Sequence, residues 1–216
     1  MYGLRTLGVI RPESWVLAVA GGHEPPVFQL TNHVRWVFCT DLYDSPAFQE
    51  SDGVMLRDPD RFASFPYNRR RLVVQYMNAL DLRYEDETFD IVFSLSSIEH
   101  FGGMQSSKQG LMEMARVVKP GGTVALTTEL VINGAGHFSA GNLELFTPET
   151  LSEIIASTCL ELLEPIDFRV SEATRATNMS LERASAEPNR FPHIVLGCAG
   201  REFTSIILFL RRPNKS

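Results

Sequence analysis

The hydrophobic positions of this chain fall into short apolar runs of strand length, separated by polar or amphipathic segments. Most runs are continuous instead of alternating, which is typical of strands buried on both faces of a parallel sheet. The runs that we expect to form strands cover residues 15–20, 34–40, 71–77, 89–95, 122–130, 162–170 and 203–212.

Helix patterns lie between several of these runs. Residues 107–118 place their apolar side chains on one stripe and end at a Lys-Pro-Gly-Gly breaker. Residues 147–160 open with Thr147 and Pro148, a good N-cap followed by a proline in the first turn. A shorter helix is expected over residues 25–33, after a pair of glycines. Strands that alternate with helices predict a Rossmann-like, doubly wound α/β fold.

Two polar segments interrupt this alternation. Residues 43–70 and 171–202 are long and contain prolines. Segments of this length usually act as lids or binding loops. We therefore expect a single domain over residues 1–216, with a cofactor-binding half at about 14–130 and substrate or lid elements at about 43–70 and 131–202.

The composition narrows the class of protein. The 216 residues are 44% hydrophobic and 21% charged, which is typical of one globular domain with a sizeable core. The net charge of −6 and the scattered basic residues disfavour a nucleic-acid partner. The three cysteines lack metal-ligand spacing, which is typical of a reduced, cytoplasmic protein that holds no metal. No apolar run approaches the roughly 18 residues of a membrane span, so we expect no membrane contact.

The stretch from Val16 to Leu30, VLAVAGGHEPPVFQL, has the layout of a nucleotide-binding loop. A strand leads into Gly21 and Gly22 and then into a helix, although the third glycine of a dinucleotide loop is absent. Asp41 follows the second strand, about 20 residues after the loop, where a carboxylate can accept hydrogen bonds from both ribose hydroxyls. The residues alone leave open whether Asp41 binds a nucleoside or only ends a strand at the surface.

The middle of the chain carries motifs that narrow the choice of nucleoside. Asn78 follows the third strand, Phe-Asp-Ile-Val-Phe-Ser covers residues 89–94, and Glu-His follows at 99–100. Ala-Arg-Val-Val-Lys-Pro-Gly-Gly then leads into the fifth strand at 115–122. Together these motifs resemble the class I S-adenosylmethionine-dependent methyltransferases, over about residues 14–130. The resemblance implies a seven-stranded, mostly parallel sheet whose last strand is antiparallel, with S-adenosylmethionine as cofactor.

The resemblance also implies which residues contact the cofactor. The glycine loop would pass beneath the methionine and ribose portions. Asn78 stands where the family often has an aspartate facing the adenine amino group, and an amide oxygen can still accept that hydrogen bond. The implied cofactor-binding residues are Ala20, Gly21, Gly22 and Glu24 in the loop, Asp41 at the ribose, Leu42, Asn78 and Ala79 at the adenine, and Ser94 and Leu95 at the methionine moiety.

The loop departs from the usual family pattern, an acidic residue followed by three alternating glycines. Ala18 stands at the acidic position, Ala20 at the first glycine and Glu24 at the last. We interpret it as a working variant, because this cofactor has no pyrophosphate and the backbone needs a less close approach. Gly22 can still adopt a positive φ, and Glu24 could supply the carboxylate that Ala18 lacks. A degenerate loop that no longer binds is the alternative.

Methyl transfer from a sulfonium needs a base only when the acceptor must lose a proton. His100 is the leading candidate, because it follows the fourth strand near the carboxyl edge where open α/β sheets bind ligands. Its alternative role is a structural hydrogen bond at a helix start. His137, in the loop NGAGHFSAGN after the fifth strand, is the second candidate, with an exposed loop histidine as the alternative.

The first functional hypothesis is a methyltransferase that acts on a small molecule or a carbohydrate, with oxygen as the favoured acceptor atom. The second is a non-catalytic nucleoside-binding or scaffold module that keeps the fold. A nicotinamide-dependent oxidoreductase is a third, disfavoured by the missing third glycine and the Lys-Pro-Gly-Gly block. Many relatives close the site with a larger N-terminal helical cap, whereas only about 14 residues precede the first expected strand here. We therefore expect an open site, a lid from residues 43–70 or 171–202, or closure by a second copy of the chain or a partner.

Overall fold

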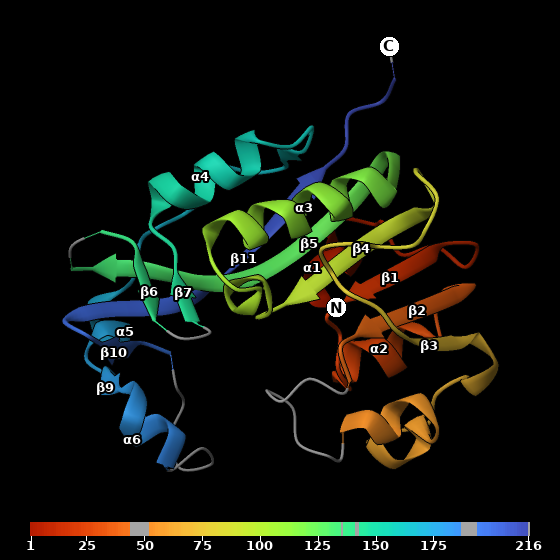
Figure 1. The fold of residues 1–216 in the computed structure, drawn as a ribbon, viewed down its shortest axis with the longest axis horizontal. Helices are drawn as coiled ribbons and strands as arrows, with labels where there is room; N and C mark the ends of the chain where they lie inside the picture. Colours follow the sequence, from red (N-terminus) through yellow and green to blue (C-terminus); the bar gives the residue numbers. More distant parts are fainter. Residues whose placement is uncertain (44–51, 135, 141–142, 187–193, 216) are drawn as a thin grey trace.

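The computed structural model describes residues 1–43, 52–134, 136–140, 143–186 and 194–215. A long twisted sheet runs through the molecule, with helices on both faces (Figure 1). Helices α3 (Met104–Val117) and α4 (Pro148–Ala156) cover one face. The other face carries α1 (Tyr2–Thr6) and α2 (Pro25–Leu30) at one end, and α5 (Glu172–Arg175) and α6 (Leu181–Ala186) at the other.

Within the described residues the sheet has nine strands, in the order β3-β2-β1-β4-β5-β11-β10-β9, with β8 paired to β11. The first five strands in this order are parallel, and β11 is antiparallel to β5. Their bounds are β1 (Trp15–Val19), β2 (Trp36–Asp41), β3 (Leu72–Tyr76), β4 (Phe89–Leu95), β5 (Val118–Asn133), β8 (Glu161–Leu162), β9 (Met179–Ser180), β10 (Leu196–Cys198) and β11 (Arg201–Arg211).

The predicted fold class is confirmed, but the number of strands in the sheet differs from the predicted number. Six of the expected strands are present, but the sixth, expected over residues 162–170, is reduced to the two residues of β8. Pro165 has no N–H to give to a ladder, and Asp167 forms a local turn by accepting a hydrogen bond from the Arg169 backbone at 3.0 Å. The short strands β9 and β10 then extend the sheet beyond the expected seven strands.

The core forms two layers, one on each face of the sheet. In β1, Leu17 and Val19 pack with the residues under α3 and α4, whereas Val16 and Ala18 pack with those around α2. All four are fully buried. Continuous apolar runs are therefore buried on both faces here, as the sequence pattern predicted.

The helix ends follow their local chemistry. Helix α3 begins after Gly103, whose φ of 107° favours glycine, and ends at Val117, where β5 begins directly. The fifth strand thus starts four residues earlier than expected and contains the Lys-Pro-Gly-Gly block. At α4, the predicted N-cap is confirmed, because the Thr147 hydroxyl accepts a hydrogen bond from the Thr150 backbone at 3.2 Å.

The segments expected as long loops contain short elements. Residues 52–71 carry the 3₁₀ helices η1 (Asp52–Leu56), η2 (Pro59–Phe62) and η3 (Arg69–Arg71). The rest of the first expected lid, residues 44–51, lies outside the described part of the chain, as do residues 187–193 of the second. A further 3₁₀ helix, η4 (Ile98–His100), follows β4, and a hairpin of β6 (Phe138–Ala140) and β7 (Leu143–Leu145) packs beside β5.

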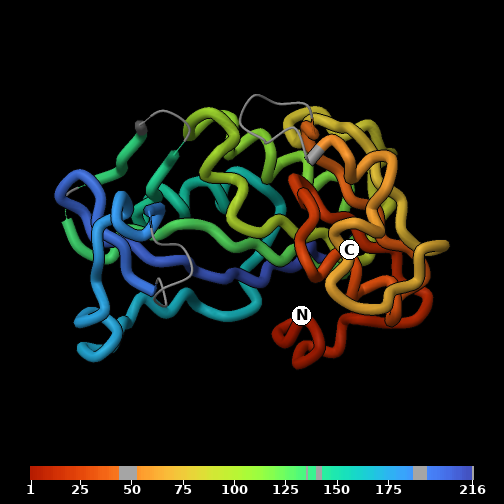
Figure 2. The backbone as a smooth tube through the Cα atoms, turned by 90° about the horizontal axis from the view of Figure 1, so that it is seen from below, coloured from red at the N-terminus to blue at the C-terminus, as the bar shows by residue number. Residues whose placement is uncertain are grey.

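Seen from below, the two ends of the molecule come from different parts of the chain (Figure 2). The first third lies at one end and the C-terminal third, apart from the end of β11 and the tail, at the other; β5 and β11 run side by side between them in both views. Among the described residues, no helix combines the length and the apolar character needed to cross a membrane.

Candidate cofactor pocket

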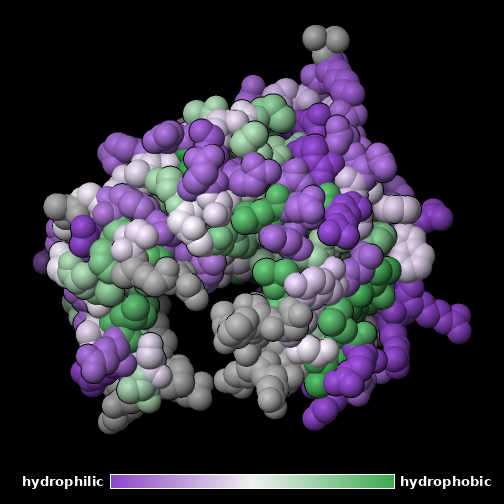
Figure 3. Space-filling view, in the orientation of Figure 1, coloured by the Kyte–Doolittle hydropathy of each residue, from purple (hydrophilic) through white to green (hydrophobic). Residues whose placement is uncertain are grey.

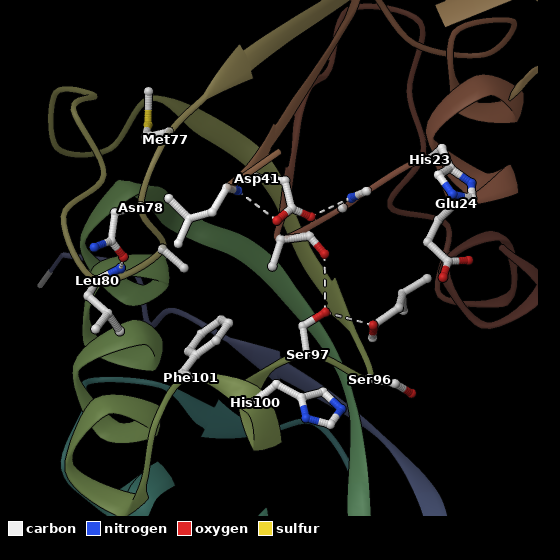
Figure 4. Close-up of a pocket in the computed structure, with 16 residues that line it drawn as sticks. His23, Glu24, Asp41, Met77, Asn78, Leu80, Ser96, Ser97, His100 and Phe101 are labelled. Carbon is white, nitrogen blue, oxygen red and sulfur yellow. Dashed lines mark hydrogen bonds between the residues drawn. The ribbon is translucent and has the colours of Figure 1, made fainter. Parts of the chain in front are cut away.

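A cavity of about 500 Å³ opens at the carboxyl ends of β1, β2, β3 and β4 (Figure 4). Each strand contributes the residues that follow it, which is where open α/β sheets bind their ligands. The lining residues are Ala20, Gly21, Gly22, His23 and Glu24 after β1, Asp41 and Leu42 at β2, Met77, Asn78, Ala79 and Leu80 after β3, and Leu95, Ser96, Ser97, His100 and Phe101 after β4.

The loop after β1 is held tightly against β2. The Gly21 backbone N–H donates to the Thr40 carbonyl at 3.0 Å. A Cβ at Gly21 would lie 2.8 Å from the Ala18 Cβ and 2.9 Å from the Cys39 Sγ, so this position has no room for a side chain. Ala20 and Gly22 both have positive φ, at 49° and 46°. Ala20 therefore adopts the backbone conformation of the glycine that it replaces, at a cost of about 1 kcal/mol.

Asp41 joins this loop to the end of β2. Its side chain is buried, and the residue is 5% exposed. Oδ2 accepts a hydrogen bond from the Gly22 backbone at 2.8 Å, and Oδ1 accepts one from the Leu42 backbone at 2.7 Å. Each carboxylate oxygen can accept more than one hydrogen bond. The two backbone bonds thus fix the carboxylate in place while leaving capacity for a ligand in the cavity.

One end of the cavity is mainly apolar. Met77, Leu80 and Phe101 lie there together with Asn78 (Figure 4). The Asn78 side-chain oxygen accepts a hydrogen bond from the Leu80 backbone at 2.9 Å, which fixes the turn after β3. This end has the flat, apolar character that suits a planar ring.

The opposite end of the cavity is polar. It holds His23, Glu24, Ser96 and His100 (Figure 4), and the His23 ring stacks on Phe62 with the centroids 4.6 Å apart. The segment that carries His100 is fixed by its backbone N–H, which donates to the Ser97 carbonyl at 2.8 Å.

Ser97 ties the segment after β4 to the glycine loop. Its hydroxyl lies within hydrogen-bond distance of the carbonyls of Ala20, at 3.1 Å, and Leu95, at 2.9 Å. Sequence reasoning missed this residue, together with Met77, Leu80, Ser96 and Phe101, although each ends or follows a predicted strand at the carboxyl edge. That shared position was the available signal.

Glu99 anchors η4 to the sheet. The residue is 1% exposed, and its Oε2 accepts a hydrogen bond from the Thr128 hydroxyl at 2.9 Å. Its Oε1 is buried without a partner among the described residues. Burial raises the pKa of the Glu99 carboxyl to about 7, against the opposing effect of the hydrogen bond from Thr128.

Two of the expected site residues lie outside the cavity lining. Ser94 is fully buried, whereas its neighbour Leu95 lines the cavity. His137 precedes β6, and its Nε2 lies 2.6 Å from Oε2 of Glu144, a residue that is only 2% exposed. The Ser139 hydroxyl donates to the other Glu144 oxygen at 2.5 Å, so this histidine takes part in a polar cluster of the β6–β7 hairpin.

The other ten expected residues are brought together around the cavity. The loop positions, Asp41 with Leu42, the pair after β3, Leu95 and His100 all line it. Within the described chain, no group of three or more His, Cys, Asp or Glu side chains is arranged to hold a metal ion.

Comparison with known proteins relates part of this chain to a protein family. Residues 57–126, which contain β3, β4 and α3, match the family model described as a methyltransferase domain. This match is consistent with a class I S-adenosylmethionine-dependent methyltransferase. The match and the order of the parallel strands agree with the family that the motifs after β3 and β4 indicated.

Two curated relatives are similar to part of this chain. This chain is 33% identical over 118 residues to methyltransferase GfsG of Streptomyces halstedii, covering 50% of this chain and 40% of the relative. It is 37% identical over 62 residues to the 27-O-demethylrifamycin SV methyltransferase of Amycolatopsis mediterranei, covering 29% of this chain and 22% of the relative. The chain therefore spans less than half the length of these relatives.

Solved structures show the same fold at low sequence identity. The [4+2]-cyclase SpnF has a TM-score of 0.63 and 17% identity, with 96% of this chain and 77% of that chain covered. Phosphoethanolamine N-methyltransferase 2 of Haemonchus contortus, in complex with S-adenosyl-L-methionine, has a TM-score of 0.61 and 19% identity, with 98% and 51% covered. These likenesses show the fold, and the chemistry has to be argued from the pocket.

Proposed function

We propose that this chain binds S-adenosylmethionine in the cavity at the carboxyl edge of the sheet and transfers its methyl group to a small-molecule acceptor, at oxygen. The observation that carries the proposal is the position of Asp41. Its carboxylate is buried, fixed by two backbone N–H groups and lies between the apolar and the polar end of one cavity.

The two ends of the cavity suit the two ends of the cofactor. Adenine would lie against Leu42, Leu80 and Phe101, with Asn78 and Ala79 at its polar edge. The ribose hydroxyls would donate to Asp41, because a carboxylate accepts hydrogen bonds and has lone pairs beyond those used by the backbone.

The methionine portion would then reach the polar end. Gly21 and Gly22, which line the cavity, would form the floor beneath it. Glu24 would accept a hydrogen bond from the methionine ammonium, and Leu95 would contact the aliphatic part. This arrangement directs the sulfonium toward His100, at the same end of the cavity.

The reaction itself is an in-line displacement. The acceptor oxygen forms a bond to the methyl carbon while the carbon–sulfur bond breaks, and its electron pair stays on sulfur. The acceptor hydroxyl loses its proton to the His100 imidazole, which passes it to water. The cofactor supplies the reactive methyl group, and the protein mainly aligns the acceptor and excludes water.

A small organic acceptor fits the lining better than a charged polymer does. The described lining carries Glu24 and Asp41 but no lysine or arginine, so it offers no counter-ion to a phosphate. One relative is named for methylation of an oxygen of a rifamycin. Closure of the site by a lid, a second copy or a partner stays a prediction.

Calorimetry tests the cofactor, and label transfer tests the reaction. We expect S-adenosylhomocysteine to bind with micromolar affinity, and Asp41→Ala to weaken this about a hundredfold, since two hydrogen bonds to a charged group are lost. The exposed Asp167→Ala is the matched control and leaves binding unchanged. NAD is the competitor that tests the oxidoreductase alternative. Absence of binding at millimolar S-adenosylhomocysteine would refute the proposal.

A second candidate function is a non-methylating use of the same fold. Ala20 occupies a left-handed position that the family gives to glycine, and one structural neighbour is titled a cyclase. Tritium transfer from methyl-labelled S-adenosylmethionine to an acceptor library separates the two. Cofactor binding without transfer to any acceptor would favour the second candidate.

A further inference from the structure

A stretch of the sheet has no helix over it in the described chain. Below the middle of the sheet, between α2 and α6, none of the described helices lies under β5 and β11 (Figure 1). Figure 3 shows the molecule hollowed at the same place. In doubly wound folds, helices normally cover both faces of the sheet. We call the stretch of β5 and β11 that no described helix covers the notch, and consider which ligand it could bind.

The side chains on this face come from two paired strands. Thr127 and Glu129 alternate with the buried Leu126 and Leu130 along β5, which places them on the lower face. Ser205 of β11 pairs with Glu129. Its neighbour Ile207 pairs with Thr127, shares this face and is 53% exposed. The notch therefore presents polar groups and one exposed apolar side chain.

The notch continues directly from the polar end of the cofactor pocket. Ser96, which lines the pocket, donates its backbone N–H to the Thr127 hydroxyl at 2.8 Å. Glu129 follows two residues later on the same face, about 7 Å further along the strand. A ligand in the notch would thus reach the end of the pocket where His100 lies.

Glu129 is the polar group of the notch that we expect to contact a ligand. It is half-buried, and its Oε1 accepts a hydrogen bond from the Ser205 hydroxyl at 2.9 Å. Burial raises the pKa of the Glu129 carboxyl, and the bond from Ser205 and the neighbouring His100 act against this rise. A carboxylate partly removed from water is stabilised by each further hydrogen-bond donor.

We propose that this notch is the acceptor subsite, where Glu129 accepts hydrogen bonds from the hydroxyl groups of a neutral, polyhydroxy acceptor. Ile207 contacts the apolar part of the acceptor, and Ser205 holds the carboxylate. Glu24 in the pocket and Glu129 in the notch repel an anionic acceptor from the same space. This inference rests on the proposed methyl transfer and adds the class of acceptor and the residue that selects it.

The test compares neutral sugars with matched anions. Wild-type protein, Glu129→Gln and the control Glu153→Gln are incubated with methyl-tritiated S-adenosylmethionine and a panel of methyl glycosides. Each glycoside is paired with the corresponding uronic acid, which differs by one carboxylate. Glu153 is exposed on α4, across the sheet from the notch, so it matches the chemistry of the change without its location.

We expect the wild type and Glu153→Gln to methylate glycosides and to reject the uronic acids. Glu129→Gln raises the KM for glycosides about tenfold, because a hydrogen bond to a charged group is exchanged for a neutral one, while kcat changes little. The same variant reduces the discrimination against uronic acids. Ser205→Ala gives a smaller rise in KM, since it removes only the group that orients the carboxylate.

Binding of S-adenosylhomocysteine, measured on the same samples, separates this inference from the proposed function. Equal affinity in all variants shows that they are folded and that the cofactor site is intact. Binding by the wild type without transfer to any glycoside overturns the acceptor class alone. Equal kinetics of Glu129→Gln and wild type, or equal use of glycosides and uronic acids, overturns the role of Glu129. Failure of the wild type to bind refutes the proposed function itself.

Discussion

The two ends of the sheet are built on different rules. At the parallel end, β1 and β4 are buried on both faces, and the residues after the strands converge on one cavity. At the antiparallel end, several positions of β11 are exposed, and the strands beyond it, β10 and β9, are only three and two residues long. The side chains of the parallel end are therefore mostly buried on both faces of the sheet, whereas β11 keeps several side chains accessible to solvent.

The proposed function and the proposed acceptor subsite assign different work to the two ends. A cofactor that a whole family shares needs a rigid site, and the parallel end supplies one through fully buried strands. An acceptor that varies between relatives needs a surface that can change without unfolding the core. The half-exposed face of β5 and β11 is such a surface, because its side chains contribute little to the packing below α3 and α4.

The largest effects on cofactor affinity and stability are expected from substitutions that disrupt the packing at one end of the sheet and leave the other end intact. Gly21→Val places side-chain atoms against Ala18 and Cys39 and should abolish binding of S-adenosylhomocysteine, with a destabilisation of about 3 kcal/mol. Gly134→Val is the matched change at the other end, where a Cβ would lie 2.9 Å from the Gly200 carbonyl. It should destabilise the protein similarly and leave cofactor affinity unchanged. Thermal unfolding with calorimetry checks both, and loss of binding in both variants would contradict the separation.

The histidine at the cavity gives the next largest effect. His100→Asn removes the proposed base and should lower kcat for an identified acceptor at least about a hundredfold, which is typical for loss of a general base. The dissociation constant for S-adenosylhomocysteine should stay within a factor of about two. Steady-state kinetics and calorimetry measure the two quantities, and a kcat equal to that of wild type would remove His100 from the mechanism.

Glu99 lies where the two ends meet and should make stability depend on pH. Its folded-state pKa of about 7 lies above its usual value, so the folded protein binds this proton more tightly than the unfolded chain. The stabilisation is complete below about pH 4 and is lost as the pH rises through 7. Glu99→Gln removes the titration.

We therefore expect the stability of Glu99→Gln relative to wild type to rise by about 3 kcal/mol between pH 4 and pH 8. Urea unfolding at several pH values gives the difference, in which the other titrating groups cancel. A difference that does not change with pH would show that Glu99 is not protonated in the folded protein at neutral pH.

The smallest effect is expected at the histidine of the hairpin. His137→Gln removes the partner of the buried Glu144 carboxylate and should destabilise the protein by about 1–2 kcal/mol. Cofactor affinity and kcat should not change, because His137 does not line the cavity. Set beside His100→Asn, this variant tests whether the two histidines divide into a chemical and a structural one. A large loss of kcat would make His137 a candidate for the base again.

The parallel end could be predicted from sequence, because its signal is local. Continuous apolar runs located β1 to β5, and the glycine loop, Asp41 with Leu42 and the motifs after β3 and β4 together located ten of the residues that line the cavity. The sixth strand was wrong, since the run at 162–170 is apolar enough for a strand but contains Pro165 and is mostly exposed. Whether this segment forms a strand depends on the residues that pack against it, and a local sequence pattern does not contain that information.

The site was harder to predict where it depends on tertiary contacts. The Ser96 backbone N–H donates to the Thr127 hydroxyl, and the Ser97 hydroxyl lies within hydrogen-bond distance of the Ala20 carbonyl. Together with the bond between Glu99 and Thr128, these contacts join residues that are 29 to 77 positions apart in the chain. His100 and His137 both follow strands in irregular segments, and their sequences do not tell them apart. Only the path of the chain places one at the cavity and the other beside Glu144.

The rate at which the cysteine beneath the glycine loop is alkylated reports how often that loop opens. Cys39 is fully buried, its Sγ lies 3.5 Å from the Gly22 carbonyl, and burial raises the pKa of its thiol to about 12. Because only an accessible thiolate reacts with alkylating reagents, Cys39 is silent until the loop swings away from β2. The exposed Cys159 reacts at once and marks zero time. The delay between the two modifications reads the opening rate of the loop, and a bound ligand that closes the loop lengthens that delay.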